Sequence, residues 1–150
     1  MINELEGWNL SIRTSLLPKD TNQHGTIFGG VILSHIDMAG AIEAKRFCEQ
    51  EVVTVAVKEV VFKEPVFVGD MISFYTRIIE TGRTSMTIEV CVIALRDDKE
   101  HNSHILTNAQ ITFVSISKDR TPEPIRIRSS KHDPPAFAPE YLARKLTRDD

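Results

Sequence analysis

The sequence predicts an α+β fold in which a curved antiparallel sheet wraps around one central helix. Residues 29–48 keep apolar side chains on nearly every face of a helix. After them, apolar residues recur with a period of two in successive segments, which is typical of strands. One strand, one helix and then a run of strands is the order of an α+β domain. The 150 residues, 41 % of them hydrophobic, are enough for one such domain and too few for two.

The N-terminal part of the chain predicts a strand, a loop and the helix. The strand covers residues 8–17 and ends before Pro18, which cannot donate to a β-ladder. A polar loop over residues 19–26 leads to the helix. Because the helix is apolar all round, we expect other elements to enclose it. Its far end is expected to be solvated, because it carries Glu43, Lys45, Arg46 and Glu49.

Four further strands are expected, over residues 52–62, 72–79, 85–95 and 105–117. Short connections at 65–70, at Gly82 and at 96–104 predict that these strands form an antiparallel meander. The segment 52–62 is apolar in both phases, so we expect a central strand there.

The composition changes near residue 117. We expect residues 1–117 to form the domain and residues 118–150 to form a proline-rich C-terminal tail, since five of the seven prolines lie between positions 122 and 139. Such a composition is typical of extended chain. Residues 140–148 suit a short helix within this tail.

Bulk features argue against several classes of protein. A net charge of −3 and a pI near 6.0 do not fit a nucleic-acid binder held by bulk electrostatics. Cys48 and Cys91 show no metal-ligand spacing, so no metal is expected. The longest apolar run, over 27–33, is far below the roughly 18 residues of a membrane span. With no secretory signal in residues 1–10, these features predict a soluble cytoplasmic protein with no membrane partner.

Asp37 is the anomaly of the helix. It lies among apolar residues, where burying a carboxylate costs free energy. Such a carboxylate is expected to have an ion-pair or hydrogen-bond partner or a role in the chemistry of the protein. One alternative is a capping box over 34–37, with the helix beginning at Ser34. Another is a salt-bridged structural aspartate. We favour a functional carboxylate, because the capping box leaves residues 29–33 without a role.

The loop before the helix supplies a second group. Asn22 lies shortly upstream of Gly29 and Gly30. Polar side chains and glycine backbone therefore meet at a helix N-terminus, where free N–H groups favour a developing negative charge. The alternative is a glycine-rich turn in which Asn22 is an ordinary turn residue.

The spacing of these groups constrains the assembly. Gly29 and Asp37 are separated by about 12 Å along a helix axis at 1.5 Å per residue. A base and an oxyanion donor must both lie about 3 Å from one reacting centre. If both residues are catalytic, the loop of one subunit must therefore meet the helix of another, and the active unit is at least a dimer.

A turn over 80–85 is a candidate phosphate site. Gly82, Arg83, Thr84 and Ser85 combine a permissive backbone, a guanidinium and two hydroxyls. A plain β-hairpin with an exposed arginine explains the same residues.

A family resemblance rests on three segments: DTNQHGTIFGGVILSHIDMAGAIEA (20–44), VVTVAVKEVVFKEPVFVGD (52–70) and TGRTSMTIEV (81–90). Together they resemble the hotdog-fold acyl-CoA thioesterases of the acyl-CoA hydrolase type. The resemblance implies a double-hotdog dimer, often assembled as a trimer of dimers, that hydrolyses acyl-CoA to free acid and CoA. It implies no cofactor, because CoA is part of the substrate.

The resemblance also implies roles for individual residues. Asp37 would be the general base or nucleophile, and Asn22 of the neighbouring subunit would orient water or the thioester carbonyl. Gly29 and Gly30 look like the backbone segment that would stabilise the oxyanion. The turn of Gly82, Arg83, Thr84 and Ser85 looks like the part that meets the CoA phosphates. An apolar groove between subunits would take the acyl chain, with Leu33, Met38, Ile42 and Phe62 as candidates.

Two other functions stay open. A hydroxyacyl thioester dehydratase of the same fold would need a histidine, for which His24 and His35 are the candidates. A non-catalytic acyl-CoA-binding sensor would be expected to carry a DNA-binding segment. Neither end of the chain contains a convincing helix-turn-helix.

Overall fold

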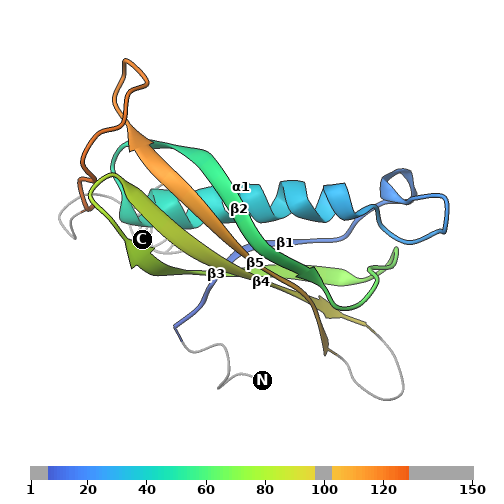
Figure 1. Cartoon of the computed structure of the whole chain (residues 1–150). Coiled ribbons are helices and arrows are strands. Elements are labelled where there is room, and N and C mark those ends of the chain that lie inside the picture. The colour runs from blue at the N-terminus through green and yellow to red at the C-terminus, as the bar shows by residue number, and fades with distance from the viewer. Residues whose placement is uncertain (1–6, 97–102, 129–150) are drawn as a thin grey trace, which may run out of the picture.

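The computed structural model describes residues 7–96 and 103–128. Its elements follow in the order β1 (Asn9–Thr14), the 3-10 turn η2 (Pro18–Asp20), α1 (Gly29–Phe47), β2 (Glu51–Phe62), β3 (Met71–Thr81), β4 (Ser85–Leu95) and β5 (Ser103–Ile116). Figure 1 shows α1 lying lengthwise against the curved sheet. The predicted α+β class is confirmed.

The sheet has the strand order β1-β3-β4-β5-β2, and every neighbouring pair is antiparallel. Only β3, β4 and β5 form a meander, so the expectation of a four-strand meander is wrong. The expectation of a central strand over 52–62 is wrong as well, because among the described residues β2 is an edge strand that pairs with β5 alone. An edge strand with apolar residues on both faces exposes some of them, and Val55 is 55 % exposed.

The link between β2 and β3 passes along one end of the sheet. Asp70 is buried at the end of this link. Its carboxylate accepts hydrogen bonds from Arg96 Nε (2.9 Å), Arg96 Nη2 (2.7 Å) and the Phe67 amide (2.9 Å). These charge-assisted bonds tie the link to the residue that follows β4.

The helix begins at Gly29, with Phe28 as its N-cap in an extended conformation. The hypothesis that it begins at Ser34 is therefore wrong. One face of the helix is buried against the sheet, and a Cβ on Gly40 would lie only 2.9 Å from the Phe113 ring, so glycine permits this close packing. The opposite face leaves Leu33 and Met38 exposed, the latter by 48 %. A single chain thus encloses only part of the helix, contrary to expectation.

The far end of the helix is not solvated as expected. Glu43 is only 6 % exposed. Its carboxylate accepts hydrogen bonds from Arg46 Nη1 (2.7 Å), Thr76 Oγ1 (2.8 Å) and Asn9 Nδ2 (3.1 Å). Because β1 and β3 supply two of these donors, the helix is fixed to that edge of the sheet by a satisfied polar network.

The described part of the C-terminal segment folds back on the sheet. The Ile125 amide donates to the Arg83 carbonyl (2.9 Å), and Gln50 Nε2 donates to the Pro124 carbonyl (2.6 Å). In Figure 1 this segment lies at the end of the sheet where α1 ends. The boundary at residue 117 remains a prediction. The short helix expected over 140–148 and most of the connection at 96–104 lie outside the described residues.

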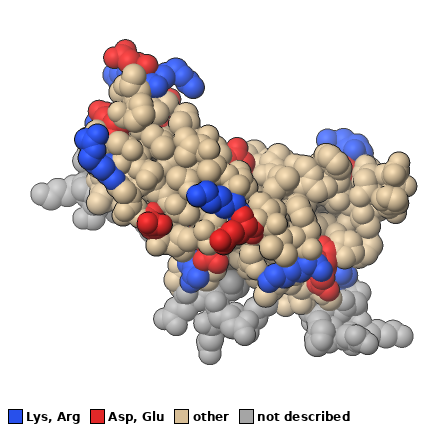
Figure 2. All heavy atoms as spheres, in the orientation of Figure 1, with Lys and Arg blue, Asp and Glu red and all other residues tan. Residues whose placement is uncertain are grey.

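Charged residues are dispersed on the face of the molecule that Figure 2 draws. Lys and Arg lie there beside Asp and Glu, singly or in small groups. Within residues 7–96 and 103–128, no helix is long and apolar enough to cross a membrane.

Candidate active site

Asp37 lies on the part of α1 that turns toward the β2 edge. Its side chain is half-buried, and its Oδ1 accepts a hydrogen bond of 2.6 Å from Thr54 Oγ1. Among the described residues, Asp37 has no ion pair and no donor to Oδ2. The alternative of a salt-bridged structural aspartate therefore finds no support there. One carboxylate oxygen is held while the other is available for chemistry.

Thr54 was not among the residues expected at the site. It lies on the edge strand β2 and is exposed apart from its contact with Asp37. Its signal in the sequence is its polarity, because it stands alone among apolar residues over 52–57. A hydroxyl on an otherwise apolar strand indicates a specific partner, but spacing alone does not identify that partner.

The loop with Asn22 is held by its own hydrogen bonds. Asn22 Oδ1 accepts from the His24 amide (2.8 Å), and Asn22 Nδ2 donates to Thr26 Oγ1 (3.0 Å). The backbone of Asn22 adds a bond from its amide to the Thr26 carbonyl (2.7 Å). Within one chain Asn22 thus has the turn-forming role that was the alternative expectation. It lies before the helix and is not brought into contact with Asp37.

Gly29 and Gly30 form the first turn of α1. Among the described residues their amides donate no backbone hydrogen bond, as the geometry of a helix N-terminus requires. The Phe62 ring lies beside Gly29, where a Cβ would be 3.6 Å from Phe62 Cζ. The end of β2 therefore flanks the two candidate oxyanion donors.

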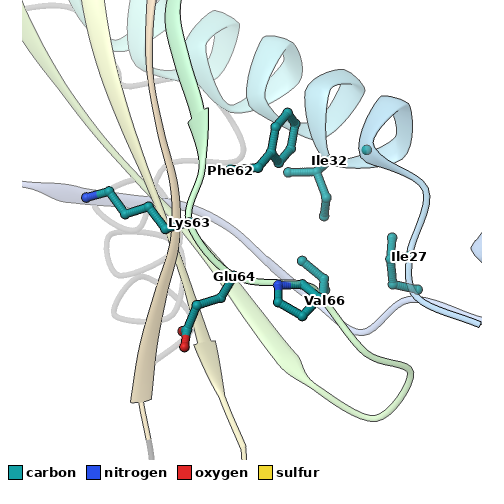
Figure 3. Close-up of a pocket in the computed structure, with 8 residues that line it drawn as sticks. Ile27, Ile32, Phe62, Lys63, Glu64 and Val66 are labelled. Atoms are coloured by element: carbon teal, nitrogen blue, oxygen red, sulfur yellow. The ribbon is translucent and has the colours of Figure 1, made fainter. Parts of the chain in front are cut away.

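A pocket of about 310 Å³ opens between this helix terminus and the end of β2. Its lining consists of Ile27, Gly29, Ile32, Phe62, Lys63, Glu64, Pro65 and Val66. In Figure 3 the apolar side chains face this space, whereas Lys63 and Glu64 point away from it. The pocket is an apolar recess beside two free backbone amides.

The Gly82 turn lies at the other end of the helix. The Gly82 amide donates to the Ser85 carbonyl (2.8 Å), and the Thr84 carbonyl accepts from the Ser115 amide (2.8 Å). Arg83 is exposed, and its side chain has no partner within the described residues. Figure 1 shows this turn at the end of the sheet where α1 ends, away from the loop before Gly29.

One chain therefore separates the expected groups into three places. The loop of Asn22 and the amides of Gly29 lie at the start of α1, Asp37 lies eight residues further along, and the Gly82 turn lies beyond the end of the helix. Because α1 is continuous, the separation of about 12 Å between Gly29 and Asp37 stands.

The two candidate histidines are placed differently. His24 is exposed in the loop. His35 bonds through Nδ1 to the Val31 carbonyl (2.8 Å) and stacks on Phe74 with ring centroids 5.6 Å apart. One ring nitrogen of His35 is therefore engaged by its own helix.

The described residues contain no group of three or more His, Cys, Asp or Glu side chains that could hold a metal ion. Burial raises the pKa of the Cys48 thiol and of the Cys91 thiol. Both thiols remain protonated near neutral pH and are poor nucleophiles and poor metal ligands there.

A family model and a curated relative both match this chain to thioesterases. The sequence model of the thioesterase superfamily matches residues 24–100, slightly more than half of the chain. An acyl-CoA thioester hydrolase of Haemophilus influenzae, itself described as uncharacterized, is 40 % identical over 112 residues, which are 73 % of this chain and 73 % of that protein.

Solved structures agree with this. A hexameric hotdog-fold thioesterase of Campylobacter jejuni is 44 % identical, with a TM-score of 0.72 over 78 % of this chain and 90 % of that one. A hexameric broad-specificity acyl-coenzyme A thioesterase, solved as an aspartate-to-alanine mutant enzyme, is 34 % identical, with a TM-score of 0.74 over 95 % of this chain and 99 % of that one. The fold expected from the family resemblance is confirmed.

Proposed function

The chain belongs to the thioesterase superfamily and to its acyl-CoA thioester hydrolases, and from this premise we propose that it cleaves acyl-CoA at sites shared between two subunits. The products are a free carboxylic acid and CoA. The observation that carries this proposal is the Asp37 carboxylate, held by Thr54 at an apolar edge that one chain leaves uncovered.

Asp37 supplies the reactive group in this proposal. Its Oδ2 takes a proton from a water molecule, and this water attacks the thioester carbonyl. Thr54 holds the carboxylate in position through its hydrogen bond to Oδ1. Direct attack by Asp37 on the carbonyl is the alternative use of the same atom. In either case the negative charge that develops on the carbonyl oxygen is stabilised by the amides of Gly29 and Gly30. The thiolate of CoA then leaves.

A second copy of the chain covers the β2 edge in this proposal. An exposed, apolar edge strand invites pairing with another strand, and a two-fold axis pairs β2 with its copy antiparallel. Val55 and Met38, both about half exposed, lie on the surface that this dimer buries. The double-hotdog dimer and its assembly as a trimer of dimers are proposed on this basis, and the hexameric state of the two solved relatives supports them.

Pairing about the middle of β2 also explains how the separated groups meet. It brings the Phe62 end of one strand beside the Glu51 end of the other. Gly29 lies against Phe62, and Asp37 bonds to Thr54 near the opposite end of the strand. The loop and helix start of one subunit thereby approach Asp37 of the other, and Asn22 is assigned to orient water or carbonyl across this interface.

The Gly82 turn receives the CoA phosphates in this proposal. Thr84 is tied to the last residues of β5, which pair with the Glu51 end of β2. The turn therefore lies at the end of the sheet that the partner's Gly29 approaches. Arg83 offers an unpaired guanidinium, and Thr84 and Ser85 add hydroxyl donors.

The test is release of free thiol from acyl-CoA by the purified protein, compared with Asp37→Asn. We expect hydrolysis by the unmodified protein and a loss of at least about a hundredfold in kcat for the variant. With a 3-hydroxyacyl-CoA we expect free thiol and no enoyl product. Enoyl product without free thiol would favour the dehydratase, and tight acyl-CoA binding without any turnover would favour the sensor.

A further inference from the structure

We propose that Gln50 is a positioning residue for binding of the CoA phosphates, and that it acts through the backbone of Arg83. This inference rests on the proposed function, in which the Gly82 turn receives these phosphates. The side chain of Gln50 holds residues 122–128 of the C-terminal segment, which we call the strap. The strap in turn holds the Gly82 turn.

Gln50 is a buried residue between the end of α1 and the start of β2, and it is only 5 % exposed. Its Nε2 donates to the Pro124 carbonyl (2.6 Å), and its Oε1 accepts from the Arg126 amide (2.9 Å). A buried primary amide that donates to one peptide group and accepts from another fixes both of them. The two peptide groups that Gln50 fixes lie on either side of Ile125.

One of these peptide groups also reaches the Gly82 turn. The Pro124 carbonyl and the Ile125 amide belong to one planar trans peptide, in which the C=O and N–H bonds point in opposite directions. Gln50 bonds to the carbonyl, and the amide donates to the Arg83 carbonyl (2.9 Å). Because the peptide is rigid, fixing its carbonyl sets the direction of the N–H that Arg83 accepts. In Figure 1 the strap lies beside the end of α1 and the turn between β3 and β4.

The backbone of Arg83 is held by the strap, whereas its neighbours in the turn are held by the sheet. The Gly82 amide donates to the Ser85 carbonyl (2.8 Å), and the Thr84 carbonyl accepts from the Ser115 amide (2.8 Å). The side chain of Arg83 is exposed. A guanidinium binds a phosphate through two parallel N–H donors, so its affinity depends on a backbone that already holds it in the right orientation.

Loss of the Gln50 amide should loosen the middle of the strap without releasing its ends. Backbone bonds hold these ends, from the Glu123 amide to the Ser115 carbonyl (3.0 Å) and from the Arg128 amide to the Phe47 carbonyl (2.7 Å). We therefore expect a variant at Gln50 to keep the fold and to lose the fixed position of the turn.

The experiment measures kcat and KM for acyl-CoA and for the N-acetylcysteamine thioester of the same acid, which carries no phosphate. Gln50→Leu is close in size and removes both hydrogen bonds. We expect its KM for acyl-CoA to rise about five-fold, with kcat changed by less than about two-fold. Hydrolysis of the N-acetylcysteamine thioester should not change.

The action through Arg83 is tested by combining two substitutions. In an Arg83→Ala background, Gln50→Leu should raise KM for acyl-CoA by less than about two-fold, because the guanidinium that it positions is gone. Thr121→Val is the matched control, since it removes a side-chain hydrogen bond to Ser117 (2.9 Å) just before the strap. Its KM for both thioesters should equal that of the unmodified protein.

Three results would overturn the role of Gln50 while hydrolysis continues: an unchanged KM in Gln50→Leu, equal losses with both thioesters, or the same fold-change with and without the Arg83 side chain. If the unmodified protein releases no thiol from any acyl-CoA, the proposed function fails and the role of Gln50 falls with it.

A second variant covers the case in which Gln50→Leu does not fold, as circular dichroism would reveal. Gln50→Glu keeps the size of the side chain and the acceptor for the Arg126 amide, but it loses the donor to the Pro124 carbonyl. A rise in KM for acyl-CoA alone supports the role of Gln50, and an unchanged KM contradicts it.

Discussion

Thr54 Oγ1 donates a hydrogen bond of 2.6 Å to Asp37 Oδ1, which joins the edge strand β2 to the middle of α1. The bond crosses from the sheet to the helix at the surface that a second copy is proposed to cover. It fixes one oxygen of the carboxylate and leaves the other unbonded among the described residues.

Replacing Thr54 with Val removes this hydroxyl and keeps the size and branching of the side chain. We expect kcat to fall about tenfold, since a hydrogen bond to a charged group contributes about 1.5–3 kcal/mol. Thr54→Ser keeps the hydroxyl and should retain most of the activity. Equal kcat for Thr54→Val and the unmodified protein would show that the bond does not serve the reaction.

Gly29→Pro tests the oxyanion donors through the backbone. Proline at the first helical position is well tolerated, and Phe28 (φ −62°, ψ 129°) already has the conformation required before proline. The substitution removes one amide donor, so we expect kcat for a short acyl-CoA to fall about a hundredfold with circular dichroism unchanged. Gly29→Ala retains the amide and should stay close to the unmodified protein with the same short substrate.

Arg83→Ala tests the phosphate contact of the Gly82 turn. We expect KM for acyl-CoA to rise about tenfold with little change in kcat, because the lost contact binds substrate and transition state alike. The N-acetylcysteamine thioester of the same acid has no nucleotide, and its hydrolysis should not change. Arg120, also exposed at this end of the sheet, serves as the control for loss of a positive charge. A proportional loss with both kinds of thioester would count against the assignment.

Glu43→Ala tests the buried network between α1 and the β1 edge. Removing the carboxylate leaves the guanidinium of Arg46 and the hydroxyl of Thr76 without their acceptor, so we expect the free energy of unfolding to fall by about 3 kcal/mol. Urea denaturation measures this. Glu80→Ala, at an exposed carboxylate, should change the stability by less than about 0.5 kcal/mol.

The cysteines give a prediction about pH. Burial raises the pKa of both Cys48 and Cys91, so at neutral pH the folded and unfolded chains alike hold these protons. Above the ordinary thiol pKa the unfolded chain releases them while the folded chain does not, and the free energy of unfolding should fall as the pH rises through this window. Thiol labelling of the folded protein at neutral pH should be slow and should accelerate in denaturant. Rapid labelling of the native protein would contradict the burial.

The sequence predicted the elements of the fold well and their order in the sheet less well. The helix from Gly29 and the alternation of β4 were recognisable because each depends on local periodicity. The edge position of β2 was not, because the same two-sided apolar pattern suits a central strand and an edge strand that another copy covers. The buried state of Glu43 was missed for a related reason. Its partners Asn9 and Thr76 are far away in the sequence and have no local signal.

Some residues of the candidate site were likewise recognisable from the sequence, whereas others required the fold. Asp37 stood out because a carboxylate is unusual within an apolar helix, and the Gly29–Gly30 pair marked the helix start. Thr54, in contrast, stands out only as a single hydroxyl on an apolar strand, and its partner Asp37 was identified when the fold placed β2 beside the helix. The apolar pocket likewise depends on how the link after Phe62 passes the loop before Gly29, which no local pattern describes.

The shared site is tested most directly by mixing Asn22→Ala and Asp37→Ala proteins under conditions of proven subunit exchange. Each variant alone should be inactive. If each site combines Asn22 of one subunit with Asp37 of the other, a hybrid dimer keeps one intact site, and an equal mixture should regain about a quarter of the unmodified activity. No recovery of thiol release, despite exchange demonstrated by differently tagged subunits, would contradict a site built from two chains.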